Sequence, residues 1–474
     1  MQVTLINPPT PKKEVWVREG RCQQFDIWGA PFPPLSLASI AGQLNNLTQT
    51  TIIDCPIENL SLEETIKKMK KIKPSLIILS TTTPTLETDL NWFAPAVKKI
   101  MPKVKIAAIG IHVTALTKQT LEKYSDLDVI IMAEPELTTK ELTQTIKKKQ
   151  SLKSVSGLAY RNKKKIVINQ PRPFIDNLDN LALPDWTGVN FKHYQMPIKK
   201  KPFSLISFSR GCPFSCKFCN AHTYYGKMIR IRNPKLVIDE IETMMALGVY
   251  DFLFWTEFMT ANKKYLINVL NEIFDRKLEK KIRWVANSRV DFVDKHILKL
   301  MKKAGCWQIV FGIEFGTNKG LKLSNKGRVN IKQSRKAVEL AQEAGLVVDG
   351  HFILGYPGET KADIKKTKDF ALSLPLTFAN FYTAVPFPGS TLYREALMNN
   401  WIIDNSWSAF DQSKTNIKTK LLKPEVIEKY ILKSYKQFYL RPIIFKRILS
   451  IAKSPGELLN ILKLGTKLIV SLLL

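Results

Sequence analysis

The hydrophobic pattern of the first part of the chain alternates short apolar runs with amphipathic segments. In residues 1–145 these runs are rich in β-branched residues, as in strands that are buried on both faces of a parallel sheet. The predicted strands are residues 3–6, 52–54, 76–80, 106–110 and 129–132. Helical patterns such as residues 62–71 separate them. We therefore predict an α/β domain of the doubly wound, Rossmann-like type, whose ligands bind beyond the carboxyl ends of the strands.

A second alternation follows in residues 201–390. The predicted strands are residues 205–208, 250–255, 283–286, 307–313, 346–353 and 378–385. The predicted helices are residues 235–246, 263–276, 294–304, 331–344 and 361–372. Six repeated units indicate a partial (β/α)6 barrel of the TIM type, in which chemistry gathers at the carboxyl ends of the strands.

Two further segments lack this alternation. Residues 146–200 contain many prolines and a polar turn at residues 161–165, so we predict a connector without long regular elements. Residues 391–474 are expected to form a helical, basic, amphipathic tail, because from residue 421 onward ten Lys or Arg face three acids. Its closing apolar run, residues 468–474, is too short to span a bilayer, which needs about 20 residues. Such a tail can lie on an anionic membrane or pack on the barrel with its lysines solvated.

The net charge of +31, with 72 Lys and Arg against 41 Asp and Glu, favours an anionic partner such as membrane headgroups or a phosphorylated substrate. A general enrichment in solvated lysine explains it equally simply, because lysine is spread along the chain. Aromatic and basic residues do not interleave as in RNA-recognition motifs, so we expect no specific nucleic acid partner. No basic segment precedes the first strand, and the cysteine content fits a reducing compartment. We expect a cytoplasmic protein, with peripheral contact at the inner face of the membrane as an option for the tail.

Three closely spaced cysteines supply the most specific chemical signal. Cys212, Cys216 and Cys219 form a C-x-x-x-C-x-x-C pattern on a loop after the apolar run of residues 203–208. Three thiolates can bind three irons of a [4Fe-4S] cluster and leave the fourth iron open to a small molecule. The alternatives are a zinc site completed by His222, a structural disulfide, or chance clustering.

The segment SRGCPFSCKFCN at residues 209–220 resembles the signature of radical S-adenosylmethionine (SAM) enzymes. The resemblance implies that the three cysteines ligate the cluster and that SAM chelates the open iron. An external reductant such as flavodoxin or ferredoxin then drives cleavage of SAM to a 5′-deoxyadenosyl radical. The resemblance also implies that Phe218, just before the last cysteine, contacts the adenine of SAM.

Further candidates for SAM binding lie at the ends of the predicted barrel strands. In this family a polar residue after the second strand meets the SAM amino group, which points to Glu257. Arg289 is the candidate partner of the SAM carboxylate, Glu314 of its ribose or amine, and Gly355 of its adenine. Structural alternatives are open: Glu257 as a helix cap, Arg289 in a surface ion pair, and Glu359 as the cap of the following helix.

The first half resembles the cobalamin-binding domain that precedes the barrel in one subgroup of this family. The similar segments are Asn7-Pro8-Pro9, residues 33–38 and Gly110-Ile111-His112. The last departs from the Gly-Gly-Pro-His of that group, and the D-x-H-x-x-G motif that supplies a histidine to cobalt is absent. The resemblance therefore implies cobalamin without a histidine beneath the cobalt. The candidate cobalamin-binding residues are Ser80, Thr81, Thr82, Gly110 and His112.

Taken together, the resemblance implies a cobalamin-dependent radical SAM enzyme that methylates an unactivated carbon of a small or lipid-like substrate. Some relatives instead form C–C or C–O bonds, or close rings, without methyl transfer, and the motifs do not separate these outcomes. A non-enzymatic electron carrier would need a fourth cysteine near the three. An RNA-modifying methylthiotransferase would need a second three-cysteine set, whereas the first half holds only Cys22 and Cys55.

Overall fold

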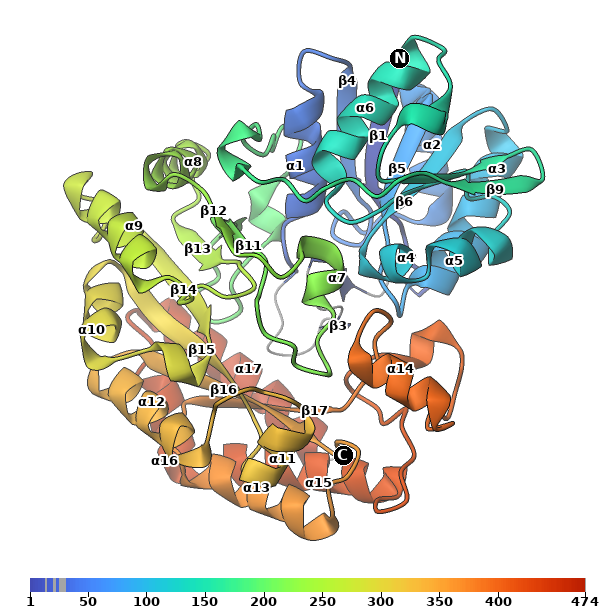
Figure 1. Cartoon of the computed structure of the whole chain (residues 1–474). Helices are drawn as coiled ribbons and strands as arrows, with labels where there is room; N and C mark the ends of the chain where they lie inside the picture. The colour runs from blue at the N-terminus through green and yellow to red at the C-terminus, as the bar shows by residue number, and fades with distance from the viewer. Residues whose placement is uncertain (13–14, 20–22, 25–30, 474) are drawn as a thin grey trace.

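The computed structural model describes residues 1–12, 15–19, 23–24 and 31–473, with the side chains at 23–24, 469 and 471–473 excepted; Cys22 lies outside them. Two sheets face each other across the centre of the molecule (Figure 1). The first has seven strands in the order β4-β1-β5-β6-β7-β8-β9. Its parallel strands are β4 (Gln49–Asp54), β1 (Gln2–Asn7), β5 (Leu76–Ser80), β6 (Lys105–Ile109) and β7 (Val129–Ile131).

Helices cover both faces of this sheet because alternate strand residues point to opposite sides. Leu76 and Ile78 of β5 join the core beneath α1 (Leu35–Leu44) and α6 (Pro135–Lys147). Ile77 and Leu79 join a second core. The helices over that second face are α2 (Leu62–Ile72), α3 (Ala94–Ile100) and α5 (Thr117–Lys123). The doubly wound α/β domain is confirmed.

The predicted connector contributes two strands that the sequence analysis missed. β8 (Leu158–Asn162) pairs antiparallel with β7, and β9 (Lys165–Ile168) returns beside it. The polar turn at residues 161–165 is the tip of this hairpin, with Lys163 at φ +55°. The seven-stranded sheet therefore continues past residue 145. These two strands are short and no helix separates them, so they lack the alternation by which the other strands were recognised.

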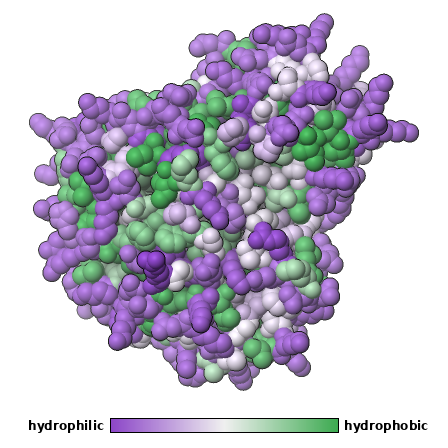
Figure 2. Space-filling model, viewed as in Figure 1, coloured by the Kyte–Doolittle hydropathy of each residue, from purple (hydrophilic) through white to green (hydrophobic). Residues whose placement is uncertain are grey.

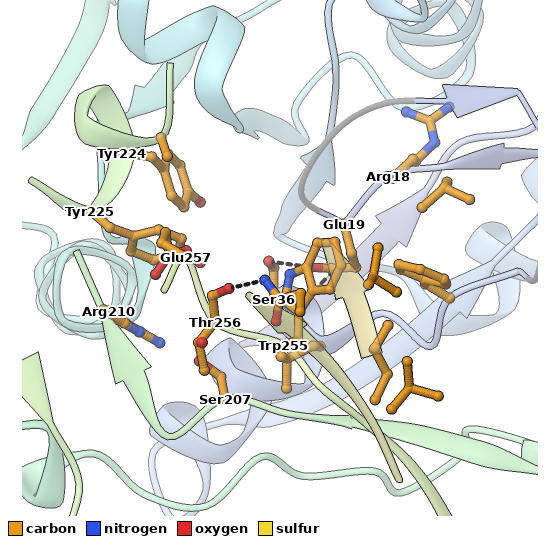
Figure 3. A pocket seen from close by; sticks show the side chains of 18 of the residues that line it. Arg18, Glu19, Ser36, Ser207, Arg210, Tyr224, Tyr225, Trp255, Thr256 and Glu257 are labelled. Atoms are coloured by element: carbon orange, nitrogen blue, oxygen red, sulfur yellow. Dashed lines mark hydrogen bonds between the residues drawn. The ribbon is translucent and has the colours of Figure 1, made fainter. Parts of the chain in front are cut away.

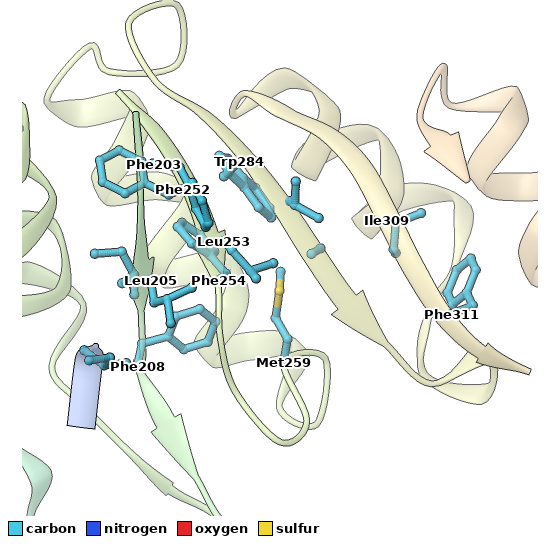
Figure 4. Close-up of a cluster of buried hydrophobic side chains, with 14 of the residues drawn as sticks. Phe203, Leu205, Phe208, Phe252, Leu253, Phe254, Met259, Trp284, Ile309 and Phe311 are labelled. Atoms are coloured by element: carbon cyan, nitrogen blue, oxygen red, sulfur yellow. The ribbon is translucent and has the colours of Figure 1, made fainter. Parts of the chain in front are cut away.

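The second sheet has six parallel strands in chain order, which confirms the partial barrel. They are β10 (Phe203–Ile206), β13 (Asp251–Phe254), β14 (Arg283–Ser288), β15 (Cys306–Glu314), β16 (Val347–Leu354) and β17 (Phe378–Thr383). The outer helices are α8 (Pro234–Ala246), α9 (Lys263–Asp275), α10 (Lys295–Lys303), α12 (Ile331–Glu343) and α13 (Lys361–Ser373). Aromatic residues fill the space behind the first strands, where Phe254 stacks on Trp284 with ring centroids 4.4 Å apart (Figure 4).

The first predicted barrel strand ends earlier than expected. β10 stops at Ile206, and the chain then forms the short antiparallel pair β11 (Ser209–Arg210) and β12 (Arg230–Ile231). Phe208 is buried but contacts Phe254 and Tyr265 from outside the strand. The apolar run of residues 203–208 therefore serves two elements and leads directly into the cysteine loop.

The C-terminal segment is helical, as predicted. It contains α14 (Thr391–Met398), α15 (Pro424–Tyr439), α16 (Pro442–Leu449) and α17 (Pro455–Leu473). Helix α15 covers the free edge of β17: the Tyr435 hydroxyl accepts a hydrogen bond from the Phe381 amide at 3.1 Å, and the Tyr439 hydroxyl bonds both the amide and the carbonyl of Ala379.

The tail also exposes apolar and basic side chains. Ile443 and Phe445 of α16 are about half exposed, and Figure 2 shows hydrophilic side chains over much of the visible surface. None of the helices in the described part of the chain is long and apolar enough to cross a membrane. The expected contact of this tail with an anionic membrane stays a prediction.

Candidate functional site

A cavity of about 610 Å³ lies where the carboxyl ends of the two sets of parallel strands face each other. The first sheet contributes the loops after β5 and β6, the start of α6 and the start of α1. The barrel contributes the cysteine loop and the inner faces of its strands. In Figure 3, Tyr224 and Tyr225 belong to the barrel wall, and Arg18 and Glu19 to the wall of the first sheet.

The cysteine loop has a fixed backbone. Gly211 adopts φ +92°, and a Cβ there would lie 2.0 Å from the Met228 carbonyl oxygen, so no other residue fits without a shift. The Lys217 amide donates to the Ser324 carbonyl at 2.9 Å, and the Asn325 side chain donates to the Ser215 carbonyl at 2.9 Å. The segment after β15 thus holds the middle of the loop on both sides of Cys216.

The cysteines fit a cluster better than a single metal ion. Cys212 and Cys219 line the cavity and Cys216 is half-buried beside it, all three as free thiols. Within the described residues, no three His, Cys, Asp or Glu side chains lie close enough to share one ion. A zinc ion would draw each sulfur to about 2.3 Å. In a cluster each cysteine binds a different iron, so the sulfurs stand further apart. The placement of the three cysteines on one loop at the cavity agrees with the [4Fe-4S] prediction.

Glu314 sits at the end of β15, where the cavity meets the cluster loop. It is buried, adopts φ +67° and accepts a hydrogen bond from the Lys326 ammonium at 3.0 Å. Lys326 also lies 5.7 Å from the ring of Phe218. A Cβ at Gly312 would lie 2.6 Å from the Glu314 carboxylate, so this glycine leaves room for it. Glu314 and Lys326 line the cavity, whereas Phe218 packs behind the loop.

Arg289 contacts the cysteine loop at Phe214 and Cys216. Its guanidinium donates twice to Asp291 at 2.9 Å, covers the ring of Phe214 at 3.7 Å, and points Nη1 at the sulfur of Cys216 at 3.9 Å. The ion pair is buried rather than on the surface. Two edges of the guanidinium are therefore occupied, and pairing of Arg289 with a SAM carboxylate stays a prediction.

Glu257 and Gly355 occupy different environments. Glu257 lines the cavity and accepts a hydrogen bond from the Gly211 amide at 3.2 Å, while burial raises its pKa to about 7. It is not the helix cap, because Asn262 caps α9. Gly355 is not among the described cavity-lining residues, and a Cβ there would lie 2.5 Å from Ile427 of α15. Glu359 is likewise no cap: Thr360 caps α13, and the buried Glu359 accepts from the Tyr356 amide at 2.9 Å.

The wall made by the first sheet brings together all five cobalamin candidates, Ser80, Thr81, Thr82, Gly110 and His112. The Thr81 and Thr85 hydroxyls donate to Asp89, which also binds Arg18, so the loop after β5 is anchored from beneath. Gly110 adopts φ +136°, and a Cβ there would lie 2.2 Å from the Thr81 carbonyl oxygen. The two loops therefore approach each other as closely as backbone allows.

His112 is held within this wall. Its Nδ1 lies 3.2 Å from the Thr83 hydroxyl, and its ring meets Trp407 edge to face at 4.5 Å. Burial lowers its pKa to about 3, so the imidazole is neutral at physiological pH. The wall therefore presents a neutral imidazole beside the hydroxyl and backbone groups of the candidate loops. Such a surface suits a large, polar-rimmed ligand such as cobalamin.

A buried ion cluster that the sequence analysis did not identify joins the two halves. Arg210, two residues before Cys212, donates to Glu134 at 3.0 Å and to Glu136 at 2.5 Å at the start of α6. Arg230 of β12 binds the other oxygen of Glu134 at 2.7 Å. All four side chains are at least 89% buried. The sequence signals were the position of Arg210 inside the cysteine motif and that of Glu134 and Glu136 directly after a predicted strand.

Glu19 is a second cavity residue that the sequence did not reveal. Its carboxylate accepts hydrogen bonds from the Ser36 amide at 3.0 Å and the Ser36 hydroxyl at 2.7 Å, at the N-terminus of α1. Burial raises its pKa to about 7. Ser36 belongs to the predicted segment 33–38, which therefore lies at the cavity as that resemblance implies.

Comparison with known proteins accounts for both halves of the chain. Residues 206–371 match the radical SAM superfamily and residues 28–143 match the B12 binding domain. A protein of Pyrococcus horikoshii named an uncharacterized methyltransferase is 32% identical over 443 residues, covering 93% of each chain. An anaerobic magnesium-protoporphyrin IX monomethyl ester cyclase of Cereibacter sphaeroides is 28% identical over 427 residues, covering 87% of this chain and 68% of the relative.

A solved structure shares the whole architecture. The radical SAM methyltransferase TsrM from Kitasatospora setae, determined with cobalamin and a [4Fe-4S] cluster bound, superimposes with a TM-score of 0.72 at 14% identity and covers 99% of both chains. The fold and the site thus define an enzyme built from a cobalamin-binding half and a radical SAM barrel. The chain belongs to the cobalamin-binding radical SAM methyltransferase family, whose cofactors are a [4Fe-4S] cluster, SAM and cobalamin.

Proposed function

We propose that this enzyme transfers a methyl group from SAM, by way of cobalamin, to an unactivated carbon of a small or lipid-like substrate bound in the cavity. The supporting observation is that one cavity is lined both by Cys212 and Cys219 and by the candidate cobalamin loops after β5 and β6. A reaction that needs two cofactors and a substrate together requires such a shared chamber, because holding reactants in place lowers the entropic part of the barrier.

Each cofactor has residues suited to hold it. Cys212, Cys216 and Cys219 would bind the cluster, while Glu257 and Glu314 would accept hydrogen bonds from the SAM amino or ribose groups. The loops around Thr81 and Gly110 would contact cobalamin through backbone and hydroxyl groups. When bound, the cluster with SAM supplies an organic radical and cobalamin supplies a carrier for the methyl group.

The remaining side chains position these groups. Arg289 fixes the cluster loop through Phe214 and Cys216, and the ion cluster of Arg210 ties that loop to α6. These contacts set the spacing between the two walls of the cavity. A one-electron donor such as flavodoxin or ferredoxin would supply the electron for each SAM cleavage.

The test uses the reconstituted enzyme under anaerobic conditions, loaded with cluster and cobalamin. It is supplied with a reductant, SAM carrying a deuterated methyl group, and fractionated small molecules from cells. We expect 5′-deoxyadenosine, S-adenosylhomocysteine and a product that carries the intact labelled methyl group, detected by mass spectrometry. Matched reactions with protein reconstituted without cobalamin are expected to form 5′-deoxyadenosine but no labelled product.

A different product pattern would replace this proposal. If a substrate is consumed and 5′-deoxyadenosine forms while the label stays in SAM or methionine, the enzyme forms C–C or C–O bonds or closes a ring. The relative named as a cyclase makes this the leading second candidate. Absence of 5′-deoxyadenosine despite a formed cluster would instead favour a non-enzymatic iron–sulfur module.

A further inference from the structure

The inner face of the barrel carries a polar cluster beyond the candidate SAM residues. Asp349 and His351 alternate along β16, and Asn380 and Tyr382 alternate along β17, so all four side chains face the same side of the sheet. His351 pairs with Asn380 across the two strands, and all four residues line the cavity. Barrels of this type normally fill their interior with branched apolar side chains, so a polar layer here requires a reason.

Asp349 is the centre of this cluster. The Asn380 amide nitrogen lies 3.0 Å and 3.3 Å from its two carboxylate oxygens, and His351 Nε2 lies 3.9 Å away. The residue is 8% exposed, and among the described side chains no Lys or Arg forms an ion pair with it. Burial raises its pKa above the ordinary value, a cost that a hydrogen-bond donor from a ligand would relieve.

The charges around the cavity leave little unpaired positive charge for an anionic substrate group. Each Lys or Arg among the described lining residues is already paired with a carboxylate. The pairs are Arg18–Asp89, Lys199–Glu457, Arg210–Glu134, Arg232–Glu240, Arg289–Asp291 and Lys326–Glu314. Glu19, Glu257 and Asp349 line the same cavity without such a pairing to Lys or Arg. The net charge of +31 therefore resides elsewhere on the molecule.

The neighbouring walls are apolar. Trp307 near the start of β15 and Phe378 at the start of β17 line the cavity, together with Met196 and Ile198 from the segment before β10. Phe378 also pairs directly with Asp349 across the strands. A ligand that reaches this part of the cavity meets aromatic and aliphatic surface around one buried acceptor group.

We propose that Asp349, oriented by Asn380 and flanked by His351, is a recognition subsite for the substrate of the reaction. The group that it takes is a neutral or cationic N–H donor, such as an amine or amide, carried on an apolar or aromatic body. Phosphate and carboxylate groups are excluded from this subsite. The identification of the ligand as the substrate rests on the proposed function; the chemistry of the subsite itself is tested by binding alone.

The experiment measures fragment binding to the enzyme loaded with cluster, cobalamin and SAM, by anaerobic calorimetry or ligand-observed NMR. The probes are benzylamine, benzamide and benzoate, which share a ring and differ in the head group. We expect benzylamine to bind at least about ten-fold more tightly than benzoate, with benzamide between them, because a hydrogen bond to a charged acceptor discriminates by about this factor.

Two variants make the test specific to this carboxylate. Asp349→Asn keeps the shape and is expected to weaken benzylamine about ten-fold while changing benzamide much less. Asn380→Asp removes the amide that donates to Asp349 and places a second carboxyl beside it, so it is expected to weaken benzylamine binding as well. Asp275→Asn makes the same chemical change as Asp349→Asn at an exposed residue of α9 and is expected to change none of the affinities. Iron content and the cobalamin absorbance confirm that each variant is folded.

Three results would overturn the subsite: benzoate binding as tightly as benzylamine, Asp349→Asn binding benzylamine like the wild type, or Asn380→Asp leaving benzylamine binding unchanged. None of these readouts depends on methyl transfer. Failure of the proposed function, seen as a label that never leaves SAM, is therefore distinguishable from failure of the subsite.

Discussion

The two sheets of this protein follow the same alternation of strand and helix, yet they use their surfaces differently. In the first sheet every residue of β5 is buried, because helices cover both faces. In the barrel, buried residues of β16 and β17 alternate with half-buried ones such as His351, Asn380 and Tyr382, which line the cavity. The first sheet therefore offers a ligand only the loops at its edge, whereas the barrel also offers an inner face.

This difference separates two kinds of binding. Loops at the edge, such as those around Thr81 and Gly110, present backbone and hydroxyl groups to one large cofactor. The inner face presents side chains that can change one at a time without disturbing the helices behind the strands. On the proposed assignment, cobalamin binding would depend on the fold of the first half, and substrate choice on individual residues of the second.

Removal of a cluster ligand should have the largest effect, because it should abolish SAM cleavage at the barrel and leave cobalamin binding at the first sheet intact. We expect Cys212→Ala to reduce formation of 5′-deoxyadenosine to background, because the cluster loses one of its three thiolates. Cobalamin retention, followed by absorbance, should persist because its candidate residues lie on the other wall. Cys306→Ala is the matched control, since Cys306 is buried at the start of β15 away from the loop. Persistent 5′-deoxyadenosine in Cys212→Ala would contradict the assignment.

Substitution in the ion cluster between the two regions should have the next largest effect, a loss of stability. Arg210→Met leaves Glu136 buried without its cation, and we expect a loss of about 3–5 kcal/mol in the free energy of unfolding. Arg276→Met is the control, because Arg276 pairs with three carboxylates, Asp239, Glu242 and Glu272, but near the surface. There we expect a loss of about 1 kcal/mol or less. Equal losses in denaturant titrations would show that the buried cluster does not hold the halves together.

Gly110→Ala tests the edge of the first sheet. The new Cβ would meet the Thr81 carbonyl at 2.2 Å with φ at +136°, so we expect a loss of about 1–3 kcal/mol and reduced cobalamin retention. Gly465→Ala, in α17 with no atom within 4 Å of the added Cβ, should raise stability by about 0.5–1 kcal/mol instead. Unchanged cobalamin absorbance in Gly110→Ala would place the cofactor away from this loop.

The remaining prediction concerns the pH dependence of stability, in a region away from both walls of the cavity. Burial raises the pKa of Glu359 from 4.5 to about 8. The nearby Asp363 adds to this rise, and Lys319 opposes it. The unfolded chain therefore releases this proton first, and stability falls as pH rises from about 4.5 to about 8, by at most about 1.4 kcal/mol per pH unit. Glu359→Gln should flatten denaturation curves in this window. An unchanged slope would mean that Glu359 is ionised in the folded protein.

The sequence predicts most of the framework and the cluster loop for identifiable reasons. Parallel strands buried on both faces, such as β5, produce apolar runs, and three cysteines within eight residues form a local motif. The hairpin of β8 and β9 was missed because its strands are short and lie outside the alternation of strand and helix. Its turn was read correctly, but nothing local showed that the flanking residues join the sheet.

The pairing of charges was the least predictable part of the site. Arg289 and Asp291 are two residues apart, but their bidentate contact depends on how β14 ends beside the cluster loop. Glu134 and Arg210 are 76 residues apart, and only the docking of the halves brings them together. Asp349 and His351 did leave a signal, since two polar residues alternate within an otherwise apolar strand. That spacing identifies a shared face, and the cavity behind it becomes visible only in three dimensions.

The two tyrosines of α15 have a consequence for the outline of the molecule. By bonding the main chain of Ala379 and Phe381, Tyr435 and Tyr439 occupy the positions that a seventh strand would need. The barrel is thereby kept from closing. Because these backbone groups are already hydrogen-bonded, a strand of a neighbouring molecule cannot pair with them. The sheet therefore ends at β17, with its last edge occupied by side-chain hydroxyls of its own chain.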